Sequence, residues 1–168
     1  MQIRLRYKEV RKLTLRKQFE SFLENNLDSA YRFAYSYVGN REDAEDAVSE
    51  SVVKALKALG GLKSVAYMKT WFFRIIINTA NDMHRKNSKT VFIEDNAAFS
   101  NENGVEDDYS RVNLESLFEC LTEEQRAVVV LRFFEDMKLG QIAEVLSVNE
   151  NTVKTRLYKA LEIIKKKL

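Results

Sequence analysis

Residues 141–157, QIAEVLSVNENTVKTRL, have the pattern of two short helices joined by a tight turn. The small side chain of Ala143 lets the helices cross closely, and Ser147-Val148-Asn149 is long enough to set an angle between them. Asn149 is also a good N-cap for a last helix that runs to the C-terminus. The spacing therefore predicts a helix-turn-helix. Its expected packing residues are Ile142, Ala143, Leu146, Val153, Leu157 and Leu161.

The face of the last helix opposite this apolar stripe is polar and basic. Such a face offers hydrogen-bond donors to base edges and cations to phosphates in a DNA major groove. An ordinary amphipathic helix with a Lys-rich exposed side is the alternative, but turn length, small residue and basic face coincide here. The candidate DNA-binding residues are Asn151, Lys154, Thr155, Arg156, Tyr158 and Lys159.

The rest of the chain favours an all-α protein with two small helical domains. Zero prolines and five glycines, with 31% charged residues, indicate long helices and few sharp turns. Apolar residues at helical spacing predict three helices within residues 18–86, broken at Gly39-Asn40 and at Gly60-Gly61, and these can form a bundle. Residues 114–168 form the second domain, in which Thr122–Gln125 is a capping box that opens a helix to about Glu135.

Two segments lie outside these domains. Residues 87–113 lose the helical period and become acidic and rich in Asn and Ser, which is typical of a flexible linker. Residues 1–17 form a basic extension, since residues 1–18 carry seven Lys/Arg and one Glu. This extension fits an ordered helix, a tether for DNA phosphates or a mistranslated upstream stretch.

The third helix has an unusual non-core face, expected to carry Phe73, Arg74, Ile77, Asn78, Asn81 and Arg85. A stacking surface combined with cations is typical of proteins that hold unpaired bases. Trp71 sits beside this face, and the loop at residues 63–66 precedes it. The competing interpretation is that Trp71 and Phe72 belong to the core and that Asn78 serves a neighbouring helix.

The second helix carries an acidic face made of Glu42, Glu45, Asp46, Ser49 and Glu50. Acids in a first helical turn stabilise the helix dipole, which explains part of this charge. Residues 41–50 hold five acids against one Arg, more than capping requires, so a basic protein partner is expected. A metal site is disfavoured because acids at consecutive helix positions diverge.

Nothing in the sequence indicates an enzyme. It has no phosphate-binding glycine loop and no nucleophile elbow, and it has a single histidine and a single cysteine, His84 and Cys120. We therefore expect no catalytic residues, no metal and no cofactor. No apolar run approaches the ~20 residues of a membrane-spanning helix, and the basic N-terminus lacks the apolar segment of a secretory signal. A reducing cytoplasm is the expected location.

Three motifs, in this order, resemble the extracytoplasmic-function (ECF) sigma factors of the sigma-70 family. They are GNREDAEDAV at residues 39–48, TWFFRIIINTAND at residues 70–82, and QIAE followed by NTVKTRLYKAL within residues 141–161. The resemblance covers roughly residues 19–168 and is nearest to the stress-responsive branch of Gram-positive bacteria. It implies that residues 18–86 are sigma region 2 and residues 114–168 are sigma region 4.

The resemblance also implies partners. Sigma factors of this kind bind core RNA polymerase, direct promoter-specific initiation and are held inactive by an anti-sigma factor. Region 2 would hold the single-stranded minus-10 element, and region 4 would read the double-stranded minus-35 element. The implied minus-10 residues are Lys63, Ser64, Trp71, Arg74, Asn78 and Arg85. The implied polymerase contacts are Asp43, Glu45, Asp46 and Glu50 at the clamp, with Leu131, Phe133 and Phe134 at the flap.

The sequence departs from the family pattern at a few positions. Ser49 stands where members usually have Gln, and Thr122 stands where they usually have Pro. Ser147 stands where many have Gly, which predicts left-handed strain of about 1 kcal/mol in the turn.

A helix-turn-helix repressor or response-regulator output domain that binds DNA alone would account for residues 120–168 only. It leaves the acidic helix and the Asn78 face without a role, and a purely structural helical adaptor explains neither DNA-like surface.

Overall fold

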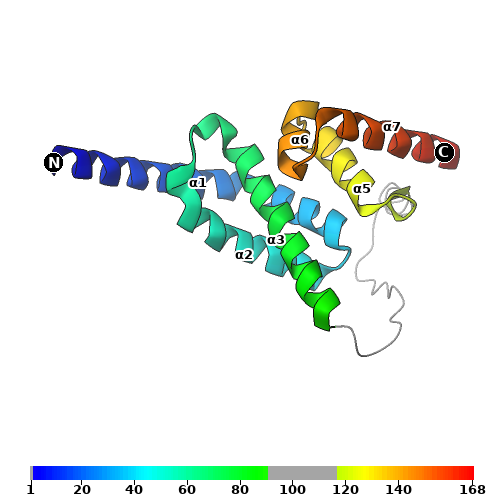
Figure 1. Cartoon of the computed structure of the whole chain (residues 1–168), viewed down its shortest axis with the longest axis horizontal. Coiled ribbons are helices and arrows are strands. Elements are labelled where there is room, and N and C mark those ends of the chain that lie inside the picture. The colour runs from blue at the N-terminus through cyan, green and yellow to red at the C-terminus, as the bar shows by residue number, and fades with distance from the viewer. Residues whose placement is uncertain (1, 91–116) are drawn as a thin grey trace.

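The structure is a computed structural model that describes residues 2–90 and 117–168, and all regular structure in these ranges is helical (Figure 1). The N-terminal bundle consists of α1 (Gln2–Val38), α2 (Arg41–Ala58) and α3 (Met68–Thr90). The C-terminal group consists of α5 (Glu123–Val129), the π-helical turn η3 (Val130–Phe134), α6 (Leu139–Leu146) and α7 (Glu150–Lys167). The predicted all-α class with two helical groups is confirmed. The predicted linker lies outside the described residues except at 87–90, which continue α3.

Aromatic side chains hold the N-terminal bundle together. Phe19 of α1 packs edge-on against Phe72 of α3 with ring centroids 5.4 Å apart, and Phe22 meets the same ring at 5.9 Å. Phe19, Phe33 and Phe72 are fully buried. Burying one such side chain contributes roughly 1.5–3 kcal/mol, so these contacts fix how α1 and α3 cross.

The junction between α1 and α2 follows the sequence signals. Gly39 has φ +83°, a left-handed conformation that glycine adopts without strain, and its N–H donates to the Tyr35 carbonyl at 2.9 Å. Asn40 then caps α2, because its side chain accepts a hydrogen bond from the Asp43 backbone N–H at 2.9 Å.

Two 3₁₀ turns, η1 (Leu59–Gly61) and η2 (Val65–Tyr67), connect α2 to α3. Leu59 and Leu62 are buried and anchor this connection to the bundle. The following residues, 63–67, are exposed. The connection is therefore an anchored loop with an accessible tip.

The C-terminal group has its own apolar centre, formed by the fully buried Val128, Leu131, Ile142, Val145 and Val153. The capping box is confirmed, since the Thr122 hydroxyl accepts from the Gln125 N–H and the Gln125 side chain accepts from the Thr122 N–H. Asn149 caps α7 as expected, accepting from the Thr152 N–H at 2.7 Å. Leu161, which was expected to pack in this centre, is instead 37% exposed, while Ala160 is buried.

The two helical groups pack against each other, with α6 on α3 and α5 on α1 (Figure 1), and their buried apolar residues form one continuous cluster. We call this the docked arrangement. At its edge, the Lys69 ammonium lies 3.0 Å from Glu135 Oε2 and also donates to the Glu135 carbonyl at 3.0 Å. The Glu135 side chain is only 1% exposed, so a nearly buried ion pair joins the two groups.

The structure corrects the expected non-core face of α3. Phe73 and Ile77 were placed on that face, but both are buried. Phe73 packs against Phe33 of α1 at 5.3 Å, and the Lys69 ammonium lies 5.9 Å from the Phe73 ring centre. A helix covered on two sides buries more of its circumference than a single apolar stripe indicates.

Among the helices described, none combines the length and the apolar character needed to cross a membrane.

Candidate nucleic-acid and polymerase-binding surfaces

The exposed side of α7 carries the predicted duplex-reading residues. Tyr158 is 69% exposed, and Asn151, Thr155 and Lys159 are also exposed. Lys154 is half-buried and forms a 3.2 Å ion pair with Glu150 one turn earlier. Surface pairs of this kind contribute little, so the Lys154 ammonium remains available to a phosphate.

Arg156 lies at the edge of this surface. Its guanidinium is 26% exposed and sits 3.7 Å from a carboxylate oxygen of Glu124 on α5. The contact ties α7 to the start of α5, which favours a positioning role for Arg156 over direct contact with bases.

On α3, the predicted Arg74, Asn78 and Arg85 are all exposed. They lie four and seven residues apart, which places them along one line of the helix. Arg85 contacts the Asp82 carboxylate, and this contact holds the pKa of Asp82 below its usual range. The line presents one amide between two cations, a combination suited to a nucleic-acid strand.

Asn81 is exposed but its side chain already has a partner, and Trp71 is less accessible than the sequence indicated. The Tyr37 hydroxyl of α1 donates to Asn81 Oδ1 at 2.6 Å. Burial raises the pKa of Tyr37, and the nearby carboxylates of Glu123 and Glu124 add to the effect. Trp71 is half-buried and packs edge-on against Phe19 at 6.1 Å, so only part of its ring is available for stacking.

Beside the exposed loop at residues 63–67 lies a groove of about 380 Å³. Its walls come from the loop, the start of α3 and the middle of α1. The lining residues are Gln18, Ser21, Phe22, Asn25, Val65, Ala66, Met68 and Lys69. Lys63 and Ser64 lie just before this lining, whereas Asn78 is not part of it. The structure thus brings the loop together with α1 and separates it from Asn78.

The acidic face of α2 is exposed as predicted. Glu45, Asp46 and Glu50 are exposed. Asp43 is half-buried at the helix cap, where its carboxylate accepts a hydrogen bond from the Asn40 side-chain amide and its backbone N–H donates to Asn40 Oδ1. Arg41 lies 2.8 Å from Glu45, and this hydrogen bond raises the pKa of Arg41. The first three turns of α2 therefore present a series of carboxylates to a partner.

An apolar hollow of about 510 Å³ adjoins this acidic face. Leu23 and Leu27 of α1 and Val48 and Val52 of α2 line it, together with Ser49 and Glu24. Apolar surface next to charge is the usual composition of a protein-binding site, with an apolar centre and a polar rim.

The predicted flap residues separate into two kinds. Phe133 and Phe134 are 59% and 50% exposed, and they are the last two residues of the π-helical turn η3. Leu131 is fully buried in the C-terminal group, so the structure corrects its assignment as a direct contact. Its burial makes it a packing residue that supports the exposed pair.

Comparison with known proteins assigns these surfaces to a family. The family model described as Sigma-70 region 2 matches residues 22–90, and the one described as Sigma-70, region 4 matches residues 111–164. RNA polymerase sigma factor SigV of Bacillus subtilis (strain 168) is 37% identical over 155 residues, covering 92% of this chain and 93% of that protein. The chain belongs to the ECF sigma factors.

Other relatives agree with this assignment. The ECF RNA polymerase sigma factor SigW of Bacillus subtilis (strain 168) is 26% identical and matches 100% of this chain and 97% of its own. The fold is similar to that of the sigma factor RpoE from Bartonella quintana, solved with the anti-sigma factor NepR. That match has a TM-score of 0.70 at 24% identity and covers 89% of this chain and 96% of the other.

An ECF sigma factor is a transcription initiation factor without catalytic activity of its own; it binds core RNA polymerase and promoter DNA and directs initiation at specific promoters. Sequence reasoning missed two features of this sigma factor. One is the contribution of α1 to the groove, through Gln18, Ser21 and Asn25. The other is the apolar hollow beside the acidic helix. For the groove, the only signal in the sequence was a set of polar residues on α1. For the hollow, it was apolar residues of α1 that helical spacing assigned to the core.

Proposed function

We propose that the three exposed surfaces divide the work of initiation. The acidic face of α2, centred on Asp43, Glu45, Asp46 and Glu50, docks on the clamp of core polymerase, with the adjoining apolar hollow at the centre of the contact. Phe133 and Phe134 contact the flap. Their exposure in a folded group supports this role, because large apolar side chains left in water indicate an interaction site.

The minus-10 element is assigned to region 2. Arg74, Asn78 and Arg85 follow the melted strand along α3, while Lys63 and Ser64 lie at the mouth of the groove beside the loop. A groove of about 380 Å³ next to an exposed loop supports capture of one flipped base. Trp71 supports the strand from its half-buried position.

The minus-35 element is assigned to α7. Asn151, Thr155, Tyr158 and Lys159 present exposed polar groups on one side of a helix held by a helix-turn-helix. Lys154 neutralises phosphates, and Arg156 orients the helix through Glu124. The proposal rests chiefly on the exposure of this α7 face. An α-helix fits the DNA major groove, and the exposed polar side chains can hydrogen-bond to the edges of the bases there.

The proposed domain boundaries follow from these assignments. Residues 18–86 act as region 2, residues 114–168 as region 4, and residues 87–113 as the acidic linker between them. Residues 1–17 are the basic extension, and within it residues 2–17 are the part of α1 that precedes region 2.

Promoter binding requires the docked arrangement to open. The centres of the minus-10 and minus-35 elements are about 85 Å apart, at about 3.4 Å per base pair. Even α1, the longest helix of the described residues at 37 residues, spans only ~56 Å. Helical groups that pack side by side therefore cannot engage both elements of one straight duplex at once.

Control by an anti-sigma factor is part of the proposal. The sigma factor RpoE, of similar fold, was solved with the anti-sigma factor NepR, and CnrH, which has a similar fold at a TM-score of 0.64, was solved in complex with the cytosolic domain of CnrY. A partner that binds and holds the docked arrangement would keep both DNA surfaces from acting together. The site of action is the cytoplasm, where core polymerase meets DNA.

Co-purification with core RNA polymerase, followed by run-off transcription on a randomised promoter library, tests the proposal. We expect binding to core and new start sites preceded by a common pair of elements. Binding to duplex DNA without any binding to core polymerase would instead support a stand-alone repressor.

A further inference from the structure

α1 begins far outside the bundle. Its first buried core residue is Leu15, and residues 3–14 are exposed on every side. We call residues 3–14 the basic arm. At ~1.5 Å per residue it projects about 18 Å from the bundle, and Figure 1 shows it leaving the molecule at the N-terminus.

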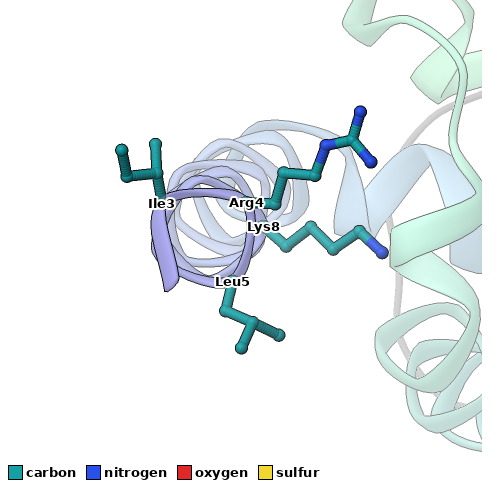
Figure 2. Close-up of a pocket in the computed structure, with 4 residues that line it drawn as sticks. All are labelled: Ile3, Arg4, Leu5 and Lys8. Carbon is teal, nitrogen blue, oxygen red and sulfur yellow. The ribbon is translucent and has the colours of Figure 1, made fainter. Parts of the chain in front are cut away.

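The cations of the arm are ordered around the helix. Arg4, Lys8 and Arg11 are spaced by four and three residues, so they form one stripe, and Leu15 continues the same line four residues later. Because Leu15 packs into the bundle, this basic stripe lies on the side of the arm that faces the body of the protein. Figure 2 shows Arg4 and Lys8 reaching to that side and Ile3 pointing away from it.

The arm leaves the bundle beside the loop that precedes α3. α1 contacts η1, and its residues Gln18 and Phe22 line the groove together with Val65 and Ala66 of the loop. Lys63 is exposed between η1 and η2. The basic stripe is therefore placed at the same end of the bundle as the groove.

We propose that the basic arm binds the phosphate backbone of promoter DNA next to the minus-10 segment, as an extension of the region 2 surface. This inference rests on the proposed function, since it presupposes that the groove end faces the minus-10 element. Charge complementarity supports DNA as the occupant: residues 1–18 carry seven Lys/Arg against Glu9 as the one acid. Phosphate contacts of this kind add affinity and register without reading sequence.

The exposed apolar side chains of the arm lie mostly away from the basic stripe. Ile3, Tyr7, Val10 and Leu13 fall within about 120° of one another around the helix, and Leu5 lies about 160° away from Ile3. Figure 2 shows Ile3 and Leu5 pointing to different sides. A basic helix with an apolar face also suits an anionic bilayer. The position of the basic stripe at the groove end of the bundle favours DNA, and binding to a bilayer is the competing outcome of the test.

The test uses holoenzyme reconstituted with core polymerase and a promoter selected from the randomised library. Arg4→Gln/Lys8→Gln removes two charges from the stripe, and the matched control Arg6→Gln/Lys17→Gln removes two charges from other sides of the same helix. Gln keeps the helix propensity, and all four side chains are exposed. Promoter affinity is measured against salt concentration, in parallel with binding to vesicles of anionic phospholipid.

We expect the stripe variant to lower the slope of log affinity against log salt by about 2, since each lost phosphate contact removes about 0.9. The control variant should change it by less than half as much. Equal slopes for both variants would overturn the inference, and so would vesicle binding that depends on the stripe while the promoter slope stays constant. Failure of wild-type holoenzyme to initiate would reject the proposed function and this inference together, whereas normal initiation with unchanged slopes rejects the arm alone.

Discussion

Ser147 holds the turn between α6 and α7 in a left-handed conformation, with φ 55° and ψ 41°. Its N–H donates to the Glu144 carbonyl at 3.4 Å, and the next N–H, of Val148, donates to Ala143 at 3.0 Å. The backbone pattern needs positive φ at this position, and a residue with a Cβ atom adopts it at a cost of about 1 kcal/mol.

We expect Ser147→Gly to raise the free energy of unfolding by about 0.5–1 kcal/mol, because glycine removes the left-handed strain. Gly39→Ala is the reciprocal control: Gly39 has φ +83° and nothing within 4 Å of a Cβ atom, so the loss there reflects backbone strain alone. Urea denaturation of both variants measures the two effects. If Ser147→Gly instead lowered the free energy of unfolding, the serine side chain would stabilise the fold by more than its left-handed backbone destabilises it.

At the same scale, Asn78→Ala should impair open-complex formation roughly 10-fold while leaving core binding unchanged. The Asn78 amide is exposed on α3 and, in the proposal, hydrogen-bonds to an unpaired base, and such contacts are worth about 1–3 kcal/mol. Permanganate footprinting of the melted segment measures the effect, and co-purification measures core binding. An equal loss of core binding would remove Asn78 from the minus-10 surface.

At the scale of the element, α7 depends on one exposed face for duplex recognition. Lys159→Ala should reduce initiation only at promoters that need the minus-35 element, because Lys159 lies on the face that Tyr158 also presents. Lys166→Ala is a suitable control, since Lys166 lies near the end of α7 and pairs with Glu162 at 2.9 Å. Run-off transcription from promoters with intact and scrambled minus-35 sequences separates the two; an unchanged preference for the intact element would exclude a Lys159 contact.

The elements themselves were largely predictable because their ends carry local signals. Gly39, the capping box at Thr122 and the N-cap at Asn149 act within a few residues, so the sequence predicts them and the structure confirms them. The outward extension of α1 through the basic arm was left open. Its exposed residues pack against nothing, and helical periodicity arises from packing.

The burial of Phe73, Ile77 and Leu131 illustrates what the sequence could not predict. Their burial depends on packing against other elements: Phe73, for example, packs against Phe33 of α1. The groove was missed for the same reason, since it forms where α1 meets the loop before α3. The α7 surface was predicted residue by residue because a single amphipathic helix determines it.

At the scale of the whole molecule, the ion pair between Lys69 and Glu135 joins the two helical groups. Lys69→Ala would leave the Glu135 carboxylate, 1% exposed, without its cation, and a buried unpaired group costs about 1–3 kcal/mol. We expect this variant to populate an opened form, seen as a larger radius of gyration in small-angle X-ray scattering. Lys54→Ala is the control, because the half-buried Lys54 pairs with Glu50 and Asp82, which both lie within the N-terminal bundle. Identical scattering from Lys69→Ala and wild type would show that apolar contacts alone maintain docking.

In the proposed function, the docked arrangement also sets an energetic threshold for activation. If only opened molecules engage the polymerase and two promoter elements, the apparent affinity for core equals the intrinsic affinity multiplied by the opened fraction. A docking preference of about 2 kcal/mol leaves roughly one molecule in 30 open and weakens apparent binding about 30-fold. An inhibitor that binds the docked form is helped by the contacts that already stabilise this form. The stability of the interface between the two helical groups therefore sets how much free sigma factor a cell needs before transcription responds.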